Sequence, residues 1–248
     1  MHAVARLGWH GVVVHFRGCS GEANRLPRAY HSGDSAEIDW ILRRLHAAAH
    51  SALFVAGVSL GGNALLKWLG KQGRQASGII AAAASVSAPL DLAAANLALS
   101  SGFNRVYAQH FLRTLIPAAQ AKDRIFPGRI DLQRALRARS LGEFDDAVTA
   151  PLHGFLGVDD YYARSSAGPL LAGIEAPTLL LHAANDPFLP ASFLPRREQL
   201  PAPVRLELHR HGGHVGFVHS PLPGRLDWLP QRLLAHFAAH LPTSSRMR

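Results

Sequence analysis

The stretch Gly57-Val58-Ser59-Leu60-Gly61-Gly62 places a glycine two residues before a serine and another two residues after it. The apolar run Ala52–Val58 predicts a buried strand, and Gly61–Leu69 predicts a helix directly after it. A sharp turn from strand to helix lifts the serine side chain off the sheet, and the glycines leave room for the two elements to close on each other. We therefore expect Ser59 to be a nucleophile, although glycines at such a turn also serve plain packing.

The rest of the chain continues this alternation of strands and helices. Short apolar runs predict the strands, and apolar residues at helical spacing predict the helices. The predicted strands are Gly11–Phe16, Ala52–Val58, Gly78–Val86, Pro177–His182 and Val204–Leu208, and the predicted helices include Ser35–His46, Gly61–Leu69 and Leu226–Leu241. Such alternation is typical of an α/β fold with a mainly parallel sheet that is covered on both faces.

The alternation stops between Asp91 and Ala167, where the sequence becomes helical and more polar. Asn104–Leu115, for example, carries apolar residues at helical spacing beside arginines. We interpret residues 91–167 as a helical cap insertion above the active site, within a single domain that spans residues 1–248. The short polar tail Thr243–Arg248 is expected to be frayed.

The composition limits the class of protein. With 48% hydrophobic and 17% charged residues among 248, the chain is too apolar to be disordered. The 26 Lys and Arg against 17 Asp and Glu are spread without a basic run, which argues against nucleic acid as the main partner. Cys19 has no second cysteine to pair with, and no stretch reaches the roughly 18 apolar residues of a membrane span. We expect a cytoplasmic protein without stable membrane insertion; its oligomeric state is not predicted.

A serine needs a base to become a nucleophile, and the base needs a carboxylate to orient it. Asp186, in Ala184-Asn185-Asp186-Pro187, follows the predicted strand Pro177–His182, and His214 follows the strand after that. Open α/β sheets bind ligands at the carboxyl ends of their strands, which is where both residues and Ser59 fall. We expect His214 to be the general base, Asp186 to orient it, and the backbone N–H of Leu60 to help hold an oxyanion.

Other residues compete for these roles. Cys19 is a weaker candidate nucleophile, because no helix N-terminus or histidine partner is evident beside it. Asp186 comes before a proline and fits an ordinary turn residue as well. If the strand before it is misplaced, the orienting carboxylate has three alternatives, which are Asp34, Asp91 and Asp159.

A metal site is the competing interpretation of His209-Arg-His-Gly-Gly-His214. The spacing approximates the H-x-H-x-D-H pattern of metal-dependent hydrolases, but Gly213 stands where that pattern has its aspartate. Without the acidic ligand, and with His209 on a predicted strand, we favour a chemistry that uses no metal and no organic cofactor.

Several longer motifs occur in the same order as in a known family. The chain resembles the YheT-type branch of the α/β-hydrolases, whose eukaryotic relatives are abhydrolase-domain lipases and esterases. The motifs are His15-Phe-Arg-Gly-Cys-Ser-Gly21, Asn24-Arg-Leu-Pro-Arg-Ala-Tyr-His31, Gly57-Val-Ser-Leu-Gly-Gly-Asn63, Phe144-Asp-Asp-Ala-Val-Thr-Ala-Pro151, Asn185-Asp-Pro-Phe188 and Gly213-His-Val-Gly-Phe-Val218. The resemblance implies an α/β-hydrolase fold, a triad of Ser59, Asp186 and His214, and hydrolysis of carboxylic (acyl) esters as small-molecule substrates.

The resemblance also implies a segment upstream of Met1. Relatives carry early strands there, together with a His-Gly loop whose N–H completes the oxyanion hole, whereas Met1–Leu7 here resembles the end of the helix that follows. We therefore expect an N-terminally truncated fold with a gap in the middle of the sheet, between the strands Gly11–Phe16 and Ala52–Val58, and a turnover lowered by roughly 10²–10³-fold for the lost donor. Restoring the segment should raise turnover and melting temperature. The alternative is a hydrolase-fold binding protein that lacks catalysis.

Overall fold

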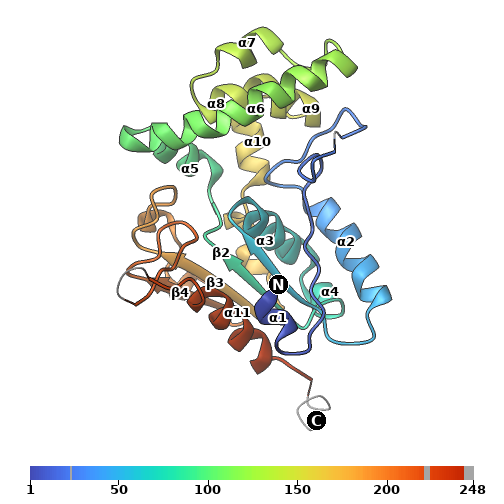
Figure 1. The fold of residues 1–248 in the computed structure, drawn as a ribbon, viewed down its shortest axis with the longest axis vertical. Coiled ribbons are helices and arrows are strands. Elements are labelled where there is room, and N and C mark those ends of the chain that lie inside the picture. Colours follow the sequence, from blue (N-terminus) through green and yellow to red (C-terminus); the bar gives the residue numbers. More distant parts are fainter. Residues whose placement is uncertain (23, 221–223, 243–248) are drawn as a thin grey trace. The chain divides into compact units, whose positions relative to one another are not determined.

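The computed structural model describes residues 1–22, 24–220 and 224–242 (Figure 1). The chain divides into two compact units. Unit 1 consists of Met1–Val13, Ser32–Leu90 and Ala167–Arg248, and unit 2 consists of Val14–His31 and Asp91–Ser166. The frayed tail expected at Thr243–Arg248 lies outside the described residues.

A four-stranded parallel sheet forms the centre of unit 1. Its strands stand in the order of the sequence: β1 (Phe54–Val58), β2 (Ala82–Val86), β3 (Thr178–Ala183) and β4 (Val204–His209). In a parallel sheet all carboxyl ends reach the same edge, so the segments that follow β1, β3 and β4 emerge together. The predicted α/β fold with a parallel sheet is confirmed, and each of these strands lies within or at most one residue beyond a predicted one.

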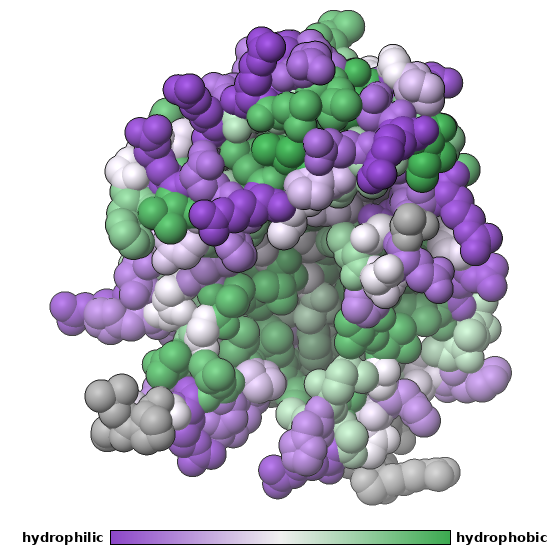
Figure 2. Space-filling view, turned by 45° about the horizontal axis from the view of Figure 1, so that its top comes forward, coloured by the Kyte–Doolittle hydropathy of each residue, from purple (hydrophilic) through white to green (hydrophobic). Residues whose placement is uncertain are grey.

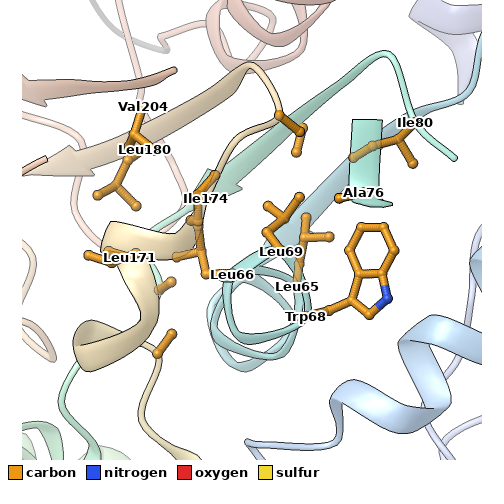
Figure 3. Close-up of a cluster of buried hydrophobic side chains, with 14 of the residues drawn as sticks. Leu65, Leu66, Trp68, Leu69, Ala76, Ile80, Leu171, Ile174, Leu180 and Val204 are labelled. Atoms are coloured by element: carbon orange, nitrogen blue, oxygen red, sulfur yellow. The ribbon is translucent and has the colours of Figure 1, made fainter. Parts of the chain in front are cut away.

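One face of the sheet is covered by α3 (Leu60–Gln72) and α2 (Ser35–Ala48). The apolar face of α3 packs on the sheet, and each fully buried leucine there contributes roughly 1.5–3 kcal/mol to stability. Trp68 joins the two helices, because its indole N–H donates a hydrogen bond to Asp39 Oδ1 on α2 at 2.9 Å. Figure 3 shows this core, which includes Leu65, Leu66, Trp68, Leu69, Leu171, Ile174 and Leu180.

The other face is covered by α11 (Trp228–Ala239). Alternate residues of the strands, such as Leu179 and Leu181 of β3, point to this side. Phe54 of β1 stacks between two aromatic rings, with centroid distances of 5.4 Å to Trp9 and 5.2 Å to Phe237. The remaining short helices of unit 1 are α1 (His2–Ala5), α4 (Arg74–Ser77), η3 (Gly168–Gly173), η4 (Ala191–Phe193) and η5 (Arg197–Gln199).

The predicted strand Gly11–Phe16 is wrong. These residues form no regular secondary structure, and the side chains of Val12 and Val13 are 65% and 61% exposed. β1 is at one edge of the sheet, and no strand in the described part of the chain pairs with residues 11–16. β-branched residues favour strands only where a neighbouring strand supplies hydrogen bonds and packing, and this stretch has no such neighbour.

Unit 2 is helical, as the sequence predicts for residues 91–167. Its long helix α6 packs its buried face against α7 and α8, and Asp91 caps the start of α5 by accepting a hydrogen bond from Ala94 N–H at 3.0 Å. The unit also contains residues 14–31, although nothing in their sequence predicted that they belong with the helical unit. The helices are α5 (Leu92–Leu99), η1 (Gly102–Asn104), α6 (Arg105–Ile125), α7 (Leu132–Arg137), α8 (Leu141–Phe144), the π-helical turn η2 (Asp145–Thr149), α9 (Ala150–His153) and α10 (Val158–Ser165).

Unit 2 contains a desolvated carboxyl group. Asp145 accepts hydrogen bonds from the hydroxyls of Thr149 at 2.6 Å and Tyr162 at 2.9 Å. Burial raises its pKa to about 6, against the opposing effect of these two hydrogen bonds. Nearby, the two ring nitrogens of His153 contact the carbonyl oxygens of Thr149 at 2.7 Å and of Ala29 at 2.9 Å, which connects residues 14–31 to the helices.

Replacing Asp145 with asparagine should stabilise unit 2 in a pH-dependent way. A raised pKa means that the folded state disfavours the charged carboxylate, so this group lowers stability as pH rises from about 4 to about 6 and remains unfavourable above that. A neutral amide escapes the penalty. Relative to the wild type, Asp145→Asn should gain up to about 3 kcal/mol between pH 4 and pH 8.

Urea unfolding followed by tyrosine absorbance measures the stability of unit 2, because all four tyrosines lie in unit 2 and all four tryptophans lie in unit 1. Tryptophan fluorescence of the same samples reports unit 1 and should not change. The matched control is Asp146→Asn: hydrogen bonds from Val158 N–H and Arg134 lower the pKa of Asp146, so its loss should destabilise unit 2 above pH 4. Parallel pH curves for Asp145→Asn and the wild type would contradict the prediction.

Candidate active site

Ser59 is held in a strained backbone conformation between β1 and α3. Its φ of 52° and ψ of −122° lie outside the regions that a residue with a side chain readily adopts. Two hydrogen bonds fix this conformation: Ser59 N–H donates to Val86 O at 2.8 Å, and Ser59 O accepts from Asn63 N–H at 3.1 Å. The end of β2 and the first turn of α3 therefore determine where the serine hydroxyl lies.

The glycines around Ser59 allow this close approach. A side chain on Gly57 would place its Cβ 2.5 Å from Gly61 O, which is far inside a normal contact. On Gly62 it would lie 2.6 Å from Ser85 Oγ of β2. Gly62, which is outside the G-x-S-x-G pattern, thus also allows the close approach of α3 to the sheet.

The structure brings Ser59, His214 and Asp186 into one chain of hydrogen bonds. His214 Nε2 lies 2.9 Å from Ser59 Oγ, and His214 Nδ1 lies 2.8 Å from Asp186 Oδ2. The Asp186 side chain is fully buried, and its other oxygen accepts a hydrogen bond from Phe188 N–H at 2.9 Å. With a proton on Nδ1, the imidazole donates to Asp186 and leaves Nε2 free to accept the serine proton. All three residues belong to unit 1.

Asn185 positions the loop that carries His214. Its side-chain oxygen accepts hydrogen bonds from Gly212 N–H and Gly213 N–H, both at 2.9 Å. Gly213 has a φ of 58°, and a Cβ on Gly212 would lie 2.7 Å from the ring of Phe217, so both glycines are required by the loop geometry. No role was predicted for Asn185 from the sequence. Its place between the end of a strand and Asp186 was the available signal.

The backbone N–H of Leu60 is at the first position of α3. The first N–H groups of a helix have no partner within the helix, and the helix dipole favours negative charge there. This amide therefore can donate to an oxyanion that forms beside Ser59.

Buried polar side chains for which the sequence predicted no role lie at the carboxyl ends of β2 and β3. Both ring nitrogens of His182, and the hydroxyls of Ser85 and Ser87, have no hydrogen-bond partner among the described residues. Burial lowers the pKa of His182 to about 4, against the opposing charge of Asp186, so this imidazole is neutral at neutral pH. A single histidine within an apolar strand gives no sequence signal that distinguishes such a role from core packing.

The competing candidates have different structural settings. Asp91 and Asp159 are in unit 2, where they begin α5 and α10, and Asp34 is buried at the start of α2. Desolvation raises the pKa of the Cys19 thiol, which is the opposite of what an activated nucleophile needs. His209 packs against the ring of Trp228, with centroids 4.5 Å apart. Within residues 1–22, 24–220 and 224–242, no group of three or more His, Cys, Asp or Glu side chains is placed to hold a metal ion.

The sequence matches the α/β-hydrolase fold family over residues 1–221. The chain belongs to this family, in its YheT-like branch. It is 41% identical over 248 residues to the putative esterase YheT of Escherichia coli, covering 99% of this chain and 72% of that protein. It is 32% identical over 232 residues to human phospholipase ABHD3, covering 92% of this chain and 56% of the relative. The chain thus spans about half to three quarters of the length of these relatives.

Solved structures share the fold at low sequence identity. A monoacylglycerol lipase from Paleococcus ferrophilus superposes with a TM-score of 0.52 at 18% identity, covering 95% of this chain and 88% of that one. An esterase from Exiguobacterium antarcticum gives 0.50 at 16% identity, covering 96% and 84%. At this identity the likeness shows that the fold is shared. In the part of the chain that the structure describes, none of the helices has the length and apolar character to cross a membrane.

Gly57→Ala should destabilise unit 1 because the new methyl group would meet the Gly61 carbonyl. We expect a loss of about 1–3 kcal/mol, as is usual for overpacking at a rigid contact. Urea unfolding followed by tryptophan fluorescence reports unit 1 specifically. Gly78→Ala is the matched control, since its Cβ would come no closer than 3.4 Å to Gln75 O. Equal stability of the two variants would show that close approach at Gly57 is not a constraint.

Proposed function

We propose that this chain hydrolyses carboxylic (acyl) esters through a covalent acyl-enzyme formed on Ser59. The observation that carries the proposal is the position of His214, whose two ring nitrogens lie within hydrogen-bonding distance of Ser59 Oγ and Asp186 Oδ2. A serine beside a histidine that is oriented by a buried carboxylate is the arrangement that acyl-transfer chemistry requires.

The first half of the reaction transfers the acyl group to the enzyme. His214 Nε2 removes the proton of Ser59 Oγ as this oxygen attacks the ester carbonyl carbon. The carbonyl oxygen becomes an anion, which the Leu60 N–H stabilises. When the tetrahedral intermediate collapses, the alcohol leaves with the proton held on Nε2, and an ester bond to Ser59 remains.

The second half returns the enzyme to its starting state. Water gives a proton to His214 Nε2 and attacks the acyl carbon, and the carboxylic acid leaves as Ser59 Oγ regains that proton. Asp186 stays ionised throughout and stabilises the imidazolium that forms in each half. The fixed backbone of Ser59 keeps its hydroxyl at the strand end, so little rearrangement is needed before attack.

The relatives support an acyl ester as the substrate class. One of them is named a putative esterase and another a phospholipase, and both names denote cleavage of ester bonds. We further propose that residues 91–167 act as a cap that selects the acyl group, and that the protein works on a small-molecule ester without a metal or an organic cofactor. The alternative is a binding protein that has the fold but no turnover.

A fluorophosphonate probe distinguishes the ester hydrolase from the binding protein, because the probe forms a covalent bond only with an activated serine. We expect labelling of the wild type, none of Ser59→Ala, and strongly reduced labelling of His214→Gln, which lacks the base. Ser101→Ala is the control. The Ser101 hydroxyl donates to Leu97 O on the exposed surface of unit 2, so its loss should leave the labelling unchanged. An unlabelled wild type with intact unfolding transitions would support the binding protein instead.

Hydrolysis of p-nitrophenyl acetate should lose about 10³–10⁴-fold in kcat in Asp186→Asn, since an amide at this position favours the wrong tautomer of His214. The measurement compares kcat of the variants and the wild type at equal protein concentration. Asn185→Asp is included for comparison, because its carboxylate still accepts hydrogen bonds from the N–H groups of Gly212 and Gly213. A kcat for Asp186→Asn within a few-fold of the wild type would remove Asp186 from the proposed mechanism.

A further inference from the structure

The outward face of α6 combines apolar and basic side chains. Val106, His110, Arg113, Pro117 and Arg124 repeat at helical spacing on the side away from the core, and all are exposed. Phe103, one turn before Val106, continues the row and is 77% exposed. We call these six residues, together with Arg105, the α6 face.

The apolar side chains on this face are not needed for the core of unit 2. The opposite side of α6 already supplies buried residues, among them Leu112 and Ala119, to that core. Val106 remains 57% exposed, and Leu97, just before this region, is 65% exposed. Exposed apolar side chains that gather beside charged ones on one surface are typical of an interaction site. Figure 2 shows such green side chains interleaved with purple ones on the part of the molecule that contains α6.

The charge of this region is positive and only partly neutralised. Residues 105–139 contain eight arginines and lysines but only two aspartates, and one of these, Asp131, caps the start of α7. Arg105, Arg113 and Arg124 form no ion pair with any carboxylate in the described part of the chain, unlike Arg134 and Arg164, which pair with Asp146 and Asp160. The α6 face itself carries no acidic side chain. Its charge complements an anionic surface.

A shallow depression lies within the face. It has a volume of about 350 Å³ and is lined by Arg105, Val106, Gln109, His110 and Arg113. The two arginines in this lining suit a phosphate headgroup, because a guanidinium group can donate two hydrogen bonds to one phosphate. The adjacent Phe103 and Val106 suit the acyl region just below such headgroups.

We propose that the α6 face docks unit 2 on the surface of an anionic phospholipid layer. Phe103 and Val106 enter the headgroup region, while Arg105, Arg113 and Arg124 bind lipid phosphates. The arrangement favours lipid over nucleic acid, because bases stack on aromatic side chains, whereas Val106 of this face and the exposed Leu97 beside it are aliphatic and suit hydrocarbon. The inference is independent of whether Ser59 is catalytic.

Sedimentation with vesicles tests the proposal on the full chain. We expect binding to vesicles of phosphatidylcholine with about one third phosphatidylglycerol, and little binding to pure phosphatidylcholine. Replacing Arg105, Arg113 and Arg124 together with glutamine should weaken the apparent affinity by at least about tenfold, because each arginine near an anionic surface contributes to attraction. Phe103→Ser with Val106→Ser should weaken binding even when all arginines remain.

The matched control removes the same charge from unit 1, by replacing the exposed Arg6, Arg44 and Arg74 with glutamine. This variant should bind anionic vesicles nearly as the wild type does, and circular dichroism should show equal helix content for all proteins. Three results would overturn the proposal: no binding by the folded wild type, an equal loss in the control variant, or a loss of binding to an RNA oligonucleotide in the α6-face variants without a change in vesicle binding.

Discussion

The backbone of Ser59 is the constraint on which the candidate site depends. Its positive φ is maintained because one hydrogen bond comes from the end of β2 and another from the first turn of α3. Neither element could shift without releasing the serine, and their separation is set by glycines that admit no side chain. Local strain of this kind persists only where the surrounding structure fixes it. The packed face of α3 (Figure 3) therefore stabilises the fold and, at the same time, orients one hydroxyl.

Much of unit 1 was predictable from residue pattern alone. Apolar runs that end in glycine or polar loops identify β1 to β4. Because the strands are parallel, Ser59, Asp186 and His214, which follow β1, β3 and β4, are expected at the same edge of the sheet. The pattern failed at Gly11–Phe16. Its valines have the intrinsic preference of a strand, but strand formation depends on a neighbour, and the local sequence does not encode whether a neighbour is present.

The supporting residues of the site were not predictable in the same way. Asn185 acts through two loop amides that are 27 and 28 residues away, and Gly62 acts through a serine on the next strand. His182 looks like a core residue in the sequence and becomes distinctive only when its burial and its lack of partners are known. Such roles depend on contacts between distant segments, whereas the motif around Ser59 depends on the covalent chain itself. The same holds for residues 14–31, whose place in unit 2 depends on contacts such as that of Ala29 with His153.

The way in which the two units are nested in the chain also sets an order of assembly during synthesis. Unit 2 is complete once residue 166 has left the ribosome, whereas β3 and β4 of unit 1 begin only at residues 178 and 204. Because chains emerge from the N-terminus and compact parts fold as units, the helical unit can mature while β1 and β2 still lack half of their sheet. The apolar residues of these two strands are then exposed for the longest time, which makes the nascent two-stranded stage the point at which chaperones would be most needed.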